Sequence, residues 1–200
     1  AGKNVCTYEY SRGTNMCVYE SCMKNEDSKV EIRRTLNHGG NSFTSETLYE
    51  NGRQVKKDEF EYTSNGKLTM SKIQTSKTDY LITKYTYSGK NSFKYPVRIV
   101  TSGVRDADGN IESYVTEYEY DDYGNCIKTT DDNKNVVRYT YDSLDRNTKE
   151  VLEDGKARET LYNDKENTIT TTNANGEFHD EYATHNSSGD CLELIVNDPK

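Results

Sequence analysis

Residues 118–125 read YEYDDYGN and residues 139–146 read YTYDSLDR, so one pattern recurs after 21 residues. Tyr162 continues the tyrosine series at the same interval, and Gly155 and Gly176 are separated by the same number of residues. Since residues i and i+2 of a strand point to one face, each Tyr-x-Tyr run places two phenol rings on one face of a sheet. The fixed period predicts a repeat architecture.

Outward from this stretch, short alternating runs are separated by Gly turns about every 10 to 12 residues, as in a series of hairpins. Looser copies of the tyrosine pair occur at Tyr8/Tyr10, Phe60/Tyr62 and Tyr85/Tyr87. The sequence predicts an all-β fold: an antiparallel meander of roughly 14 to 18 short strands, forming a curved single-layer or partly closed sheet. Because the repetition leaves no boundary, residues 1–200 are expected to form a single domain.

The strand register around the best copies is also predicted. Folding back over Asp121 to Gly124 places Tyr118 opposite Ile127 and Glu117 opposite Lys128, which gives a favourable charge pair. The same register one repeat later opposes Arg138 to Lys149, which is unfavourable.

Charge and hydropathy exclude several functions. The chain has 26 Lys and Arg against 34 Asp and Glu, a net charge of -8, which argues against nucleic-acid binding and against attraction to anionic membranes. No apolar run approaches the length of about 18 residues that a membrane-spanning helix needs. Seventeen Tyr and only two Pro are typical of half-buried strands rather than of disorder.

The five cysteines leave three interpretations open. Cys6 and Cys22 flank a predicted hairpin, so a cross-strand disulfide between them is possible. Cys17 is an alternative partner, and all five can also be small buried thiols. No pair has the spacing of a zinc or redox site.

Two clusters share residue types with metal sites, but their spacing does not suit a metal, and no metal or cofactor is predicted. The first consists of His179, Asp180, Glu181 and His185, whose histidines are six residues apart in a strand-like region, instead of four apart on a helix. The second consists of Asp106, Asp108, Asn110 and Glu117, which lacks the Gly that a calcium loop needs at its sixth position. The sequence contains no nucleotide-binding or nucleophile motif that nominates catalytic residues.

The segments 118–125 and 139–146 resemble YD repeats, also called Rhs repeats, whose pattern is close to Y-x-Y-D-x-x-G-R. Asp145 stands where the family has Gly, and Asp also tolerates a left-handed turn position. The resemblance covers residues 114–177 and implies a ribbon of antiparallel hairpins. It also implies an exported bacterial protein (periplasmic, secreted, surface-bound or a lipoprotein), and the start AGKNVC would suit a form whose signal peptide has been removed. Large members of the family enclose a toxin or display adhesive surfaces, and carbohydrate binding is attributed to the repeats. From the length of this chain, enclosure is not expected.

Two function classes follow. The preferred one is a non-catalytic binding or scaffold module that contacts a glycan or a surface protein through tyrosine rings. The alternative is a hydrolase acting on polysaccharide through carboxylates that the sequence does not identify. The tyrosines predicted to form the binding surface are Tyr85, Tyr87, Tyr118, Tyr120, Tyr139 and Tyr141.

Overall fold

The computed structural model describes residues 5–25, 28–88, 95–105, 108–173, 180–186, 188 and 191–197. These residues form sixteen β-strands and no helix. The strands are β1 (Cys6–Tyr10), β2 (Cys17–Asn25), β3 (Ser28–Leu36), β4 (Phe43–Glu50), β5 (Arg53–Tyr62), β6 (Leu68–Gln74), β7 (Tyr80–Thr86), β8 (Arg98–Arg105), β9 (Ile111–Tyr120), β10 (Cys126–Thr130), β11 (Val136–Tyr141), β12 (Asn147–Val151), β13 (Ala157–Asn163), β14 (Thr168–Asn173), β15 (Asp180–His185) and β16 (Cys191–Asn197).

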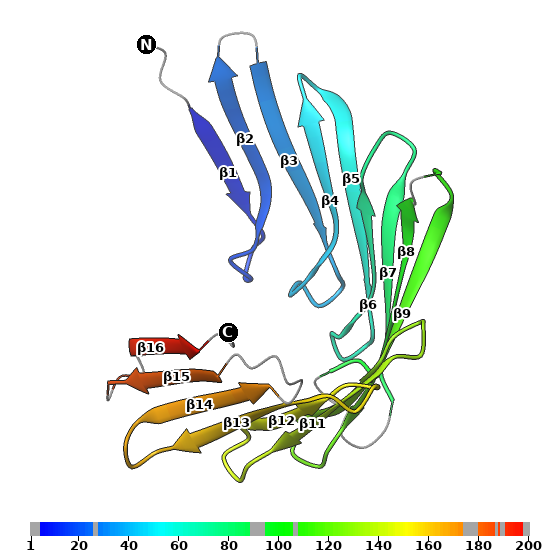
Figure 1. Cartoon of the computed structure of the whole chain (residues 1–200). Coiled ribbons are helices and arrows are strands. Elements are labelled where there is room, and N and C mark those ends of the chain that lie inside the picture. Colours follow the sequence, from blue (N-terminus) through cyan, green and yellow to red (C-terminus); the bar gives the residue numbers. More distant parts are fainter. Residues whose placement is uncertain are drawn as a thin grey trace. The chain divides into compact units, whose positions relative to one another are not determined.

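The strands form one open sheet whose order follows the sequence from β1 to β16. Neighbouring strands run antiparallel, as in the pairs β3–β4 and β10–β11, and Figure 1 shows each arrow lying beside the next one in the chain. The predicted all-β antiparallel meander is therefore confirmed, and sixteen strands lie within the predicted range.

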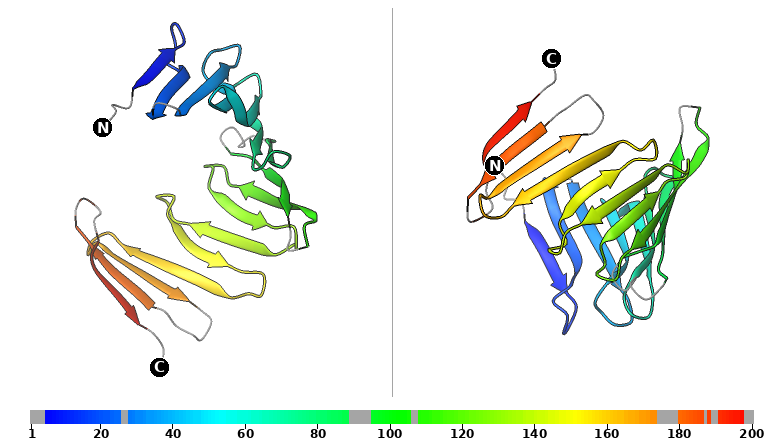
Figure 2. Two further views of the ribbon diagram at one scale, coloured as in Figure 1. Left: turned by 90° about the horizontal axis from the view of Figure 1, so that it is seen from above. Right: turned by 60° about the horizontal axis from the view of Figure 1, so that its bottom comes forward.

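The chain divides into two compact units. The first comprises Ala1–Thr86 and Ile99–Tyr114, and the second comprises Tyr87–Arg98 and Val115–Lys200. Within each unit the strands form a single layer (Figure 2). The expectation that residues 1–200 form a single domain stays a prediction.

Neither unit has a conventional apolar core. None of the described hydrophobic side chains is buried, whereas six described polar residues are: Ser21, Glu31, Thr47, Asp58, Thr168 and Thr171. A single layer has no second sheet or helix to cover its face. The strands therefore rely on half-buried rings, on the hydrogen-bond ladder and on side-chain contacts between neighbouring strands.

The best repeats turn in the same way. The backbone N–H of Asp121 donates to the carbonyl of Asn125 at 2.9 Å, and that of Asp142 donates to the carbonyl of Arg146 at 3.0 Å. Asp145 adopts φ 60°, so the sequence-based expectation that this Asp accepts the left-handed position is confirmed. Each repeat therefore begins its turn at the Asp that follows the second tyrosine.

The predicted register around this turn is wrong. Lys128 lies opposite Glu119 instead of Glu117, and Tyr118 lies opposite Thr129. The difference arises because the closed turn includes residue 125 and because a β-bulge at Ile127 leaves that residue without a partner in β9.

The pairing of Arg138 with Lys149 that was expected one repeat later is also wrong. Lys149 pairs with Thr140 and Arg138 pairs with Val151, again across a bulge before Tyr141. The unfavourable Arg138–Lys149 pair is thereby avoided.

One of the three cysteine interpretations is realised. Cys6 and Cys22 are directly opposite in β1 and β2 and form a disulfide with a Cα–Cα distance of 4.2 Å. Cys17 lies opposite Tyr10 and is a free thiol, as are Cys126 and Cys191.

Reduction of the disulfide is expected to loosen β1. Every residue of β1 is exposed, so the disulfide is a main attachment of this strand. Closing a loop of about 15 residues contributes about 3 kcal/mol, so amide exchange in β1 should accelerate by up to about 100-fold on reduction. Hydrogen exchange with and without reductant measures this. Exchange in β10 and β11 should stay unchanged, and unaltered exchange in β1 would contradict the expectation.

Candidate binding face

The tyrosine pairs of the second unit share one face of the sheet. Tyr118 lies opposite Thr129, and Thr129 lies opposite Val137, two residues before Tyr139 in β11. Directly opposed residues share a face, so the rings of β9 and β11 lie on the same side. We call the side formed by Tyr118, Tyr120, Tyr139, Tyr141 and Tyr162 the tyrosine face.

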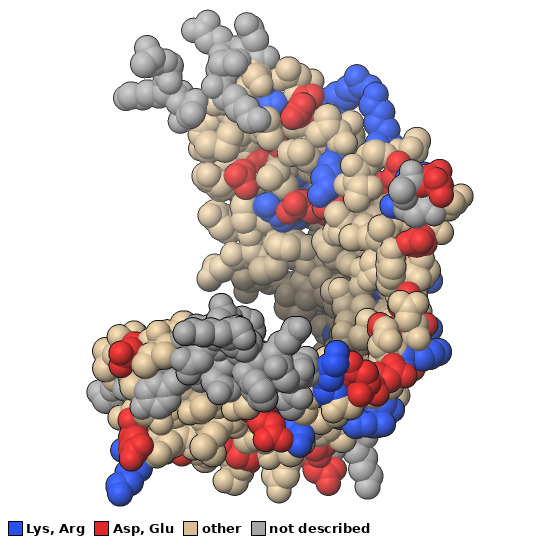
Figure 3. Space-filling model, viewed as in Figure 1, with Lys and Arg blue, Asp and Glu red and all other residues tan. Residues whose placement is uncertain are grey.

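The other side of these strands carries alternating charges. Lys128 Nζ lies 2.6 Å from Glu119 Oε1, and Lys149 Nζ lies 2.7 Å from Glu159 Oε1. Figure 3 shows Lys and Arg interspersed with Asp and Glu over the visible surface. This mixture is typical of a solvated face, so the tyrosine face is the better candidate for contact with a partner.

In four repeats the second tyrosine is fixed by its hydroxyl. Tyr120 Oη donates to the carbonyl of Pro96 at 3.0 Å, Tyr141 Oη to that of Cys126 at 2.8 Å, and Tyr162 Oη to that of Asn147 at 3.0 Å. In the first unit, Tyr62 Oη donates to the carbonyl of Phe43 at 3.1 Å. The acceptor is a backbone carbonyl at or just before the start of the preceding strand, so the hydroxyls link neighbouring strands repeat after repeat.

These hydroxyls lie in protected surroundings. Burial raises the pKa of Tyr120 to about 12. Burial also raises the pKa of Tyr141 and of Tyr62 above the ordinary tyrosine value. Tyr62, Tyr120 and Tyr141 therefore remain protonated donors at neutral pH, as their hydrogen bonds require.

All six tyrosines that the sequence predicts as binding residues are half-buried in the structure. Four of them, Tyr118, Tyr120, Tyr139 and Tyr141, lie together on the tyrosine face of the second unit. Tyr85 belongs to β7 in the first unit, and Tyr87 follows that strand and belongs to the second unit. A binding role for these residues stays a prediction.

Two further tyrosines, Tyr95 and Tyr162, contribute to the tyrosine face. Tyr95 stacks on Tyr120 with ring centroids 5.7 Å apart, and Tyr118 stacks on Tyr120 from its own strand at 6.4 Å. Tyr95 precedes β8 outside any Tyr-x-Tyr run, so no repeat signal identifies it. Tyr162 stands in the third, weaker copy of the repeat, where the 21-residue period points to it.

Side chains of successive turns also contact each other. Asn125 Nδ2 donates to Asp145 Oδ1 at 2.8 Å, one repeat further along the chain. Arg146 Nε donates to Asp142 Oδ2 at 2.7 Å, and the Arg146 guanidinium also pairs with Asp164. Its central carbon lies 4.4 Å from the centroid of the Tyr162 ring. These contacts add a second series of links between repeats along the turns.

The turn carboxylates make folding sensitive to acid. The backbone N–H of Arg146 holds the pKa of Asp142 below its usual value, and the side-chain amide of Asn135 does the same for Asp131. A lowered folded-state pKa stabilises the protein above the unfolded value, near 3.9, and that contribution is lost as the pH falls through the folded-state pKa.

We therefore expect the urea midpoint to be constant between about pH 7 and pH 5 and to fall below about pH 4. Circular dichroism across this range measures it. The variant D131N/D142N should show a smaller fall than the wild type, because two of the lowered carboxylates are then absent. A midpoint that rises on acidification below pH 4 would contradict the interpretation.

Both clusters that share residue types with metal sites lie partly outside the described residues. No group of three or more metal-ligating side chains occurs among them. His179 and Asp106, each a member of one cluster considered above, lie outside the described residues. No described helix is long and apolar enough to cross a membrane.

Comparison with known proteins identifies the repeat. The RHS Repeat family matches residues 120–158, which span the second tyrosine of β9 to the start of β13. No curated protein matches the sequence.

Among solved structures, the chain is similar to TcdB2-TccC3 without its hypervariable C-terminal region, with 16% identity and a TM-score of 0.63 over 96% of this chain and 10% of that chain. It is also similar to TcdB2-TccC3-TEV (10% identity, TM-score 0.53, 96% of this chain and 11% of that chain) and to TcdB2-TccC3-Cdc42 (10% identity, TM-score 0.51, 93% and 11%). The chain thus spans about a tenth of the length of these proteins. At these identities the similarity shows the fold.

Proposed function

We propose that this chain, which carries an RHS repeat at residues 120–158, is a non-catalytic scaffold: a sheet of hairpins that holds a tyrosine-lined surface in place. The observation that carries the proposal is the repeated hydrogen bond from the second tyrosine to the preceding strand. Tyr120, Tyr141 and Tyr162 make it in three successive repeats. A hydroxyl engaged in this way serves the sheet and is not available for chemistry.

The directions of the shifted carboxylate pKa values support a scaffold over a hydrolase. A polysaccharide hydrolase needs one carboxyl group with a raised pKa as its general acid. In the described part of the chain, the carboxylates whose pKa is shifted are all shifted downward, and Glu31, Glu59 and Asp79 are examples. Hydrogen bonds to the charged form, from Tyr19 to Glu31, from Lys57 to Glu59 and from Arg105 to Asp79, are the main cause.

A reducing-end assay on a panel of polysaccharides tests this part of the proposal. We expect no release of sugar above the buffer control. Release that follows the protein through purification and disappears on substitution of a single carboxylate would favour the hydrolase instead.

The second part of the proposal is that the tyrosine face binds a partner. Within the described residues, the hydroxyls of Tyr118 and Tyr139 make no hydrogen bond, and both residues are half-buried. The two strands that carry them are separated by β10, which corresponds to about 10 Å between the strands. Aromatic rings spaced in this way suit the apolar faces of sugar rings or the side chains of a protein.

A glycan array with the wild type and the variant Y118A/Y139A tests this surface. We expect glycan binding by the wild type and a loss of about tenfold or more in the variant, because two ring contacts of about 1 kcal/mol each disappear. The variant Y123A is the control, since Tyr123 is 86% exposed at a turn. Unchanged binding in Y118A/Y139A would exclude these rings, and an array without any signal would favour a protein partner.

We further propose that the protein works outside the cytoplasm, as a periplasmic, secreted or surface-bound protein. The Cys6–Cys22 disulfide supports this location, because disulfides persist in oxidising compartments. The codons that precede Ala1 in the gene provide the test: a signal sequence is expected there, and its absence argues against export by the ordinary route.

A further inference from the structure

The apolar residues of the second unit continue to the edge of its sheet. Tyr162 in β13 lies opposite Ile169 in β14, and Ile169 lies opposite Ala183 in β15. Ala183 in turn lies opposite Leu194 in β16. Because directly opposed residues share a face, these four residues form one row on the tyrosine face, which we call the apolar row.

The apolar row becomes exposed where it reaches β16. Tyr162, Ile169 and Ala183 are half-buried, whereas Leu194 is 58% exposed. The next residue, Ile195, lies on the other face and is 42% exposed. Within the described part of the chain, β16 pairs with β15 alone (Figure 1). This strand therefore presents an unpaired backbone edge with exposed apolar residues on both faces.

The first unit shows how this protein protects an unpaired stretch of strand. The β5–β6 ladder begins at Glu59 and Lys72, inside β5, and side chains replace the ladder before that point. The N–H of Gln74 donates to Asp58 Oδ1 at 2.9 Å, and the N–H of Lys57 donates to Gln74 Oε1 at 2.7 Å. Side-chain acceptors thus occupy backbone donors that another strand would otherwise use.

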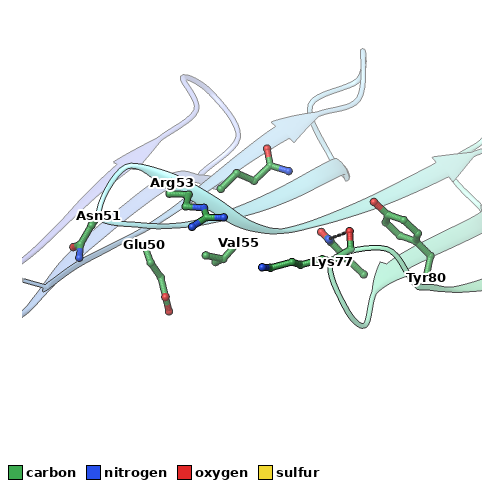
Figure 4. Close-up of a pocket in the computed structure, with 8 residues that line it drawn as sticks. Glu50, Asn51, Arg53, Val55, Lys77 and Tyr80 are labelled. Carbon is green, nitrogen blue, oxygen red and sulfur yellow. Dashed lines mark hydrogen bonds between the residues drawn. The ribbon is translucent and has the colours of Figure 1, made fainter.

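Charged side chains also flank that stretch of β5. Figure 4 shows Arg53 and Lys77 directed toward Val55 in the hollow that these residues line. Charged side chains, above all Lys, are a common means of keeping a strand edge from pairing with another chain. β16 contains no Lys, Arg or Pro, and Glu193 is its one charged residue. The edge of β16 lacks the protection that β5 has, so it is suited to pairing with another strand.

We propose that this other strand is β16 of a second copy of the chain, paired antiparallel about a twofold axis at Ile195. An axis perpendicular to the sheet places Ile195 opposite itself, Leu194 opposite Val196, and Glu193 opposite Asn197. All five pairs then match an apolar residue with an apolar one or a polar residue with a polar one. The apolar row of one copy thereby continues onto the same face of the other.

The neighbouring registers are less favourable. An axis at Glu193 opposes two carboxylates, and an axis at Leu194 opposes Glu193 to Ile195. Pairing also stops short of Leu192, because β16 has a bulge there. Symmetric pairing of residues 193–197 therefore uses the whole regular part of the strand. This self-association does not depend on what the tyrosine face binds.

Sedimentation velocity of the full chain tests the proposal. The chain carries C191S throughout, so that the exposed thiol of Cys191 cannot link two copies. The weight-average mass should rise from one chain toward two as the concentration is raised from about 5 to about 500 µM, because small interfaces associate weakly. A mass that stays at one chain overturns the proposal. A mass that rises beyond two chains, as in a head-to-tail contact, also overturns it.

Matched variants locate the contact. I195K places two ammonium groups directly opposite each other and removes two apolar side chains, so the dissociation constant should rise at least about tenfold. L161K is the control. Leu161 is 69% exposed on the same face, but it lies in β13, which has a neighbour on each side. Its dissociation constant should be unchanged, and a rise in both variants, or in neither, contradicts the assignment.

Disulfide cross-linking tests the register. Directly opposed residues have Cα atoms about 4.5–5.5 Å apart, which a disulfide can span. I195C should therefore form a covalent dimer under mild oxidation. In L194C the two cysteines are offset along the strands and about 8 Å apart, which is too far for a disulfide. Absence of the I195C dimer, or a dimer of L194C that forms as readily, overturns the pairing about Ile195.

Discussion

The substitution Gly103→Ala is expected to lower the free energy of unfolding by at least about 3 kcal/mol. Gly103 lies within β8 and adopts φ +94°, a conformation that side chains with a Cβ rarely adopt. A Cβ at this position would lie 1.9 Å from the carbonyl oxygen of Tyr80 and 3.0 Å from its carbonyl carbon. Because the obstacle is backbone, relief requires a shift of β7 or β8.

Gly66→Ala is the matched control. Gly66 has φ +85°, and a Cβ there meets no atom within 4 Å. The free energy of unfolding of Gly66→Ala should therefore fall only by the conformational cost of a Cβ at positive φ, about 1–2 kcal/mol. Urea unfolding of both variants, followed by circular dichroism, measures the difference. If Gly103→Ala lowers the free energy of unfolding no more than Gly66→Ala does, the close approach of β8 to the Tyr80 carbonyl is wrong.

The repeat period predicted most of the fold. The Gly turns and the Tyr-x-Tyr runs predict the meander, the range of strand numbers and the common face of each tyrosine pair. Asp145 is predictable as a turn residue because Asp tolerates positive φ. These features are local, so they can be derived from spacing and residue type.

The register could not be derived in the same way. It depends on the bulge at Ile127 and on the hydrogen bond that closes the turn from Asp121 to Asn125. A bulge adds one residue to one strand, and nothing in the spacing of tyrosines marks it. The charge pair that the sequence predicted for Lys128 is present, but with Glu119.

The sites were predicted less completely. The sequence predicted tyrosines as binding residues, but it could not distinguish the roles of the two tyrosines in each Tyr-x-Tyr pair. The second members, such as Tyr120 and Tyr141, donate to backbone carbonyls, whereas Tyr118 and Tyr139 have no such bond among the described residues.

The second large effect is expected from the hydroxyls of the second tyrosines. In Y120F/Y141F/Y162F the free energy of unfolding should fall by about 3 kcal/mol, because each removed hydrogen bond contributes about 1 kcal/mol. Each substitution also leaves a backbone carbonyl without its donor, on the face where burial raises the pKa of Tyr120 to about 12. The rings themselves remain, so the variant keeps the half-buried apolar area and should still fold.

The control removes three other hydroxyls from the same unit. Tyr118, Tyr123 and Tyr139 donate no hydroxyl hydrogen bond among the described residues, so Y118F/Y123F/Y139F makes the same chemical change without removing a link between strands. Its stability should remain within about 0.5 kcal/mol of the wild type.

The comparison of these two triple variants by urea unfolding tests the central claim, that the hydroxyls of Tyr120, Tyr141 and Tyr162 link neighbouring strands of the sheet. A loss of about 3 kcal/mol in Y120F/Y141F/Y162F, with the control near the wild type, is the predicted result. Equal stability of the two triple variants would contradict the claim.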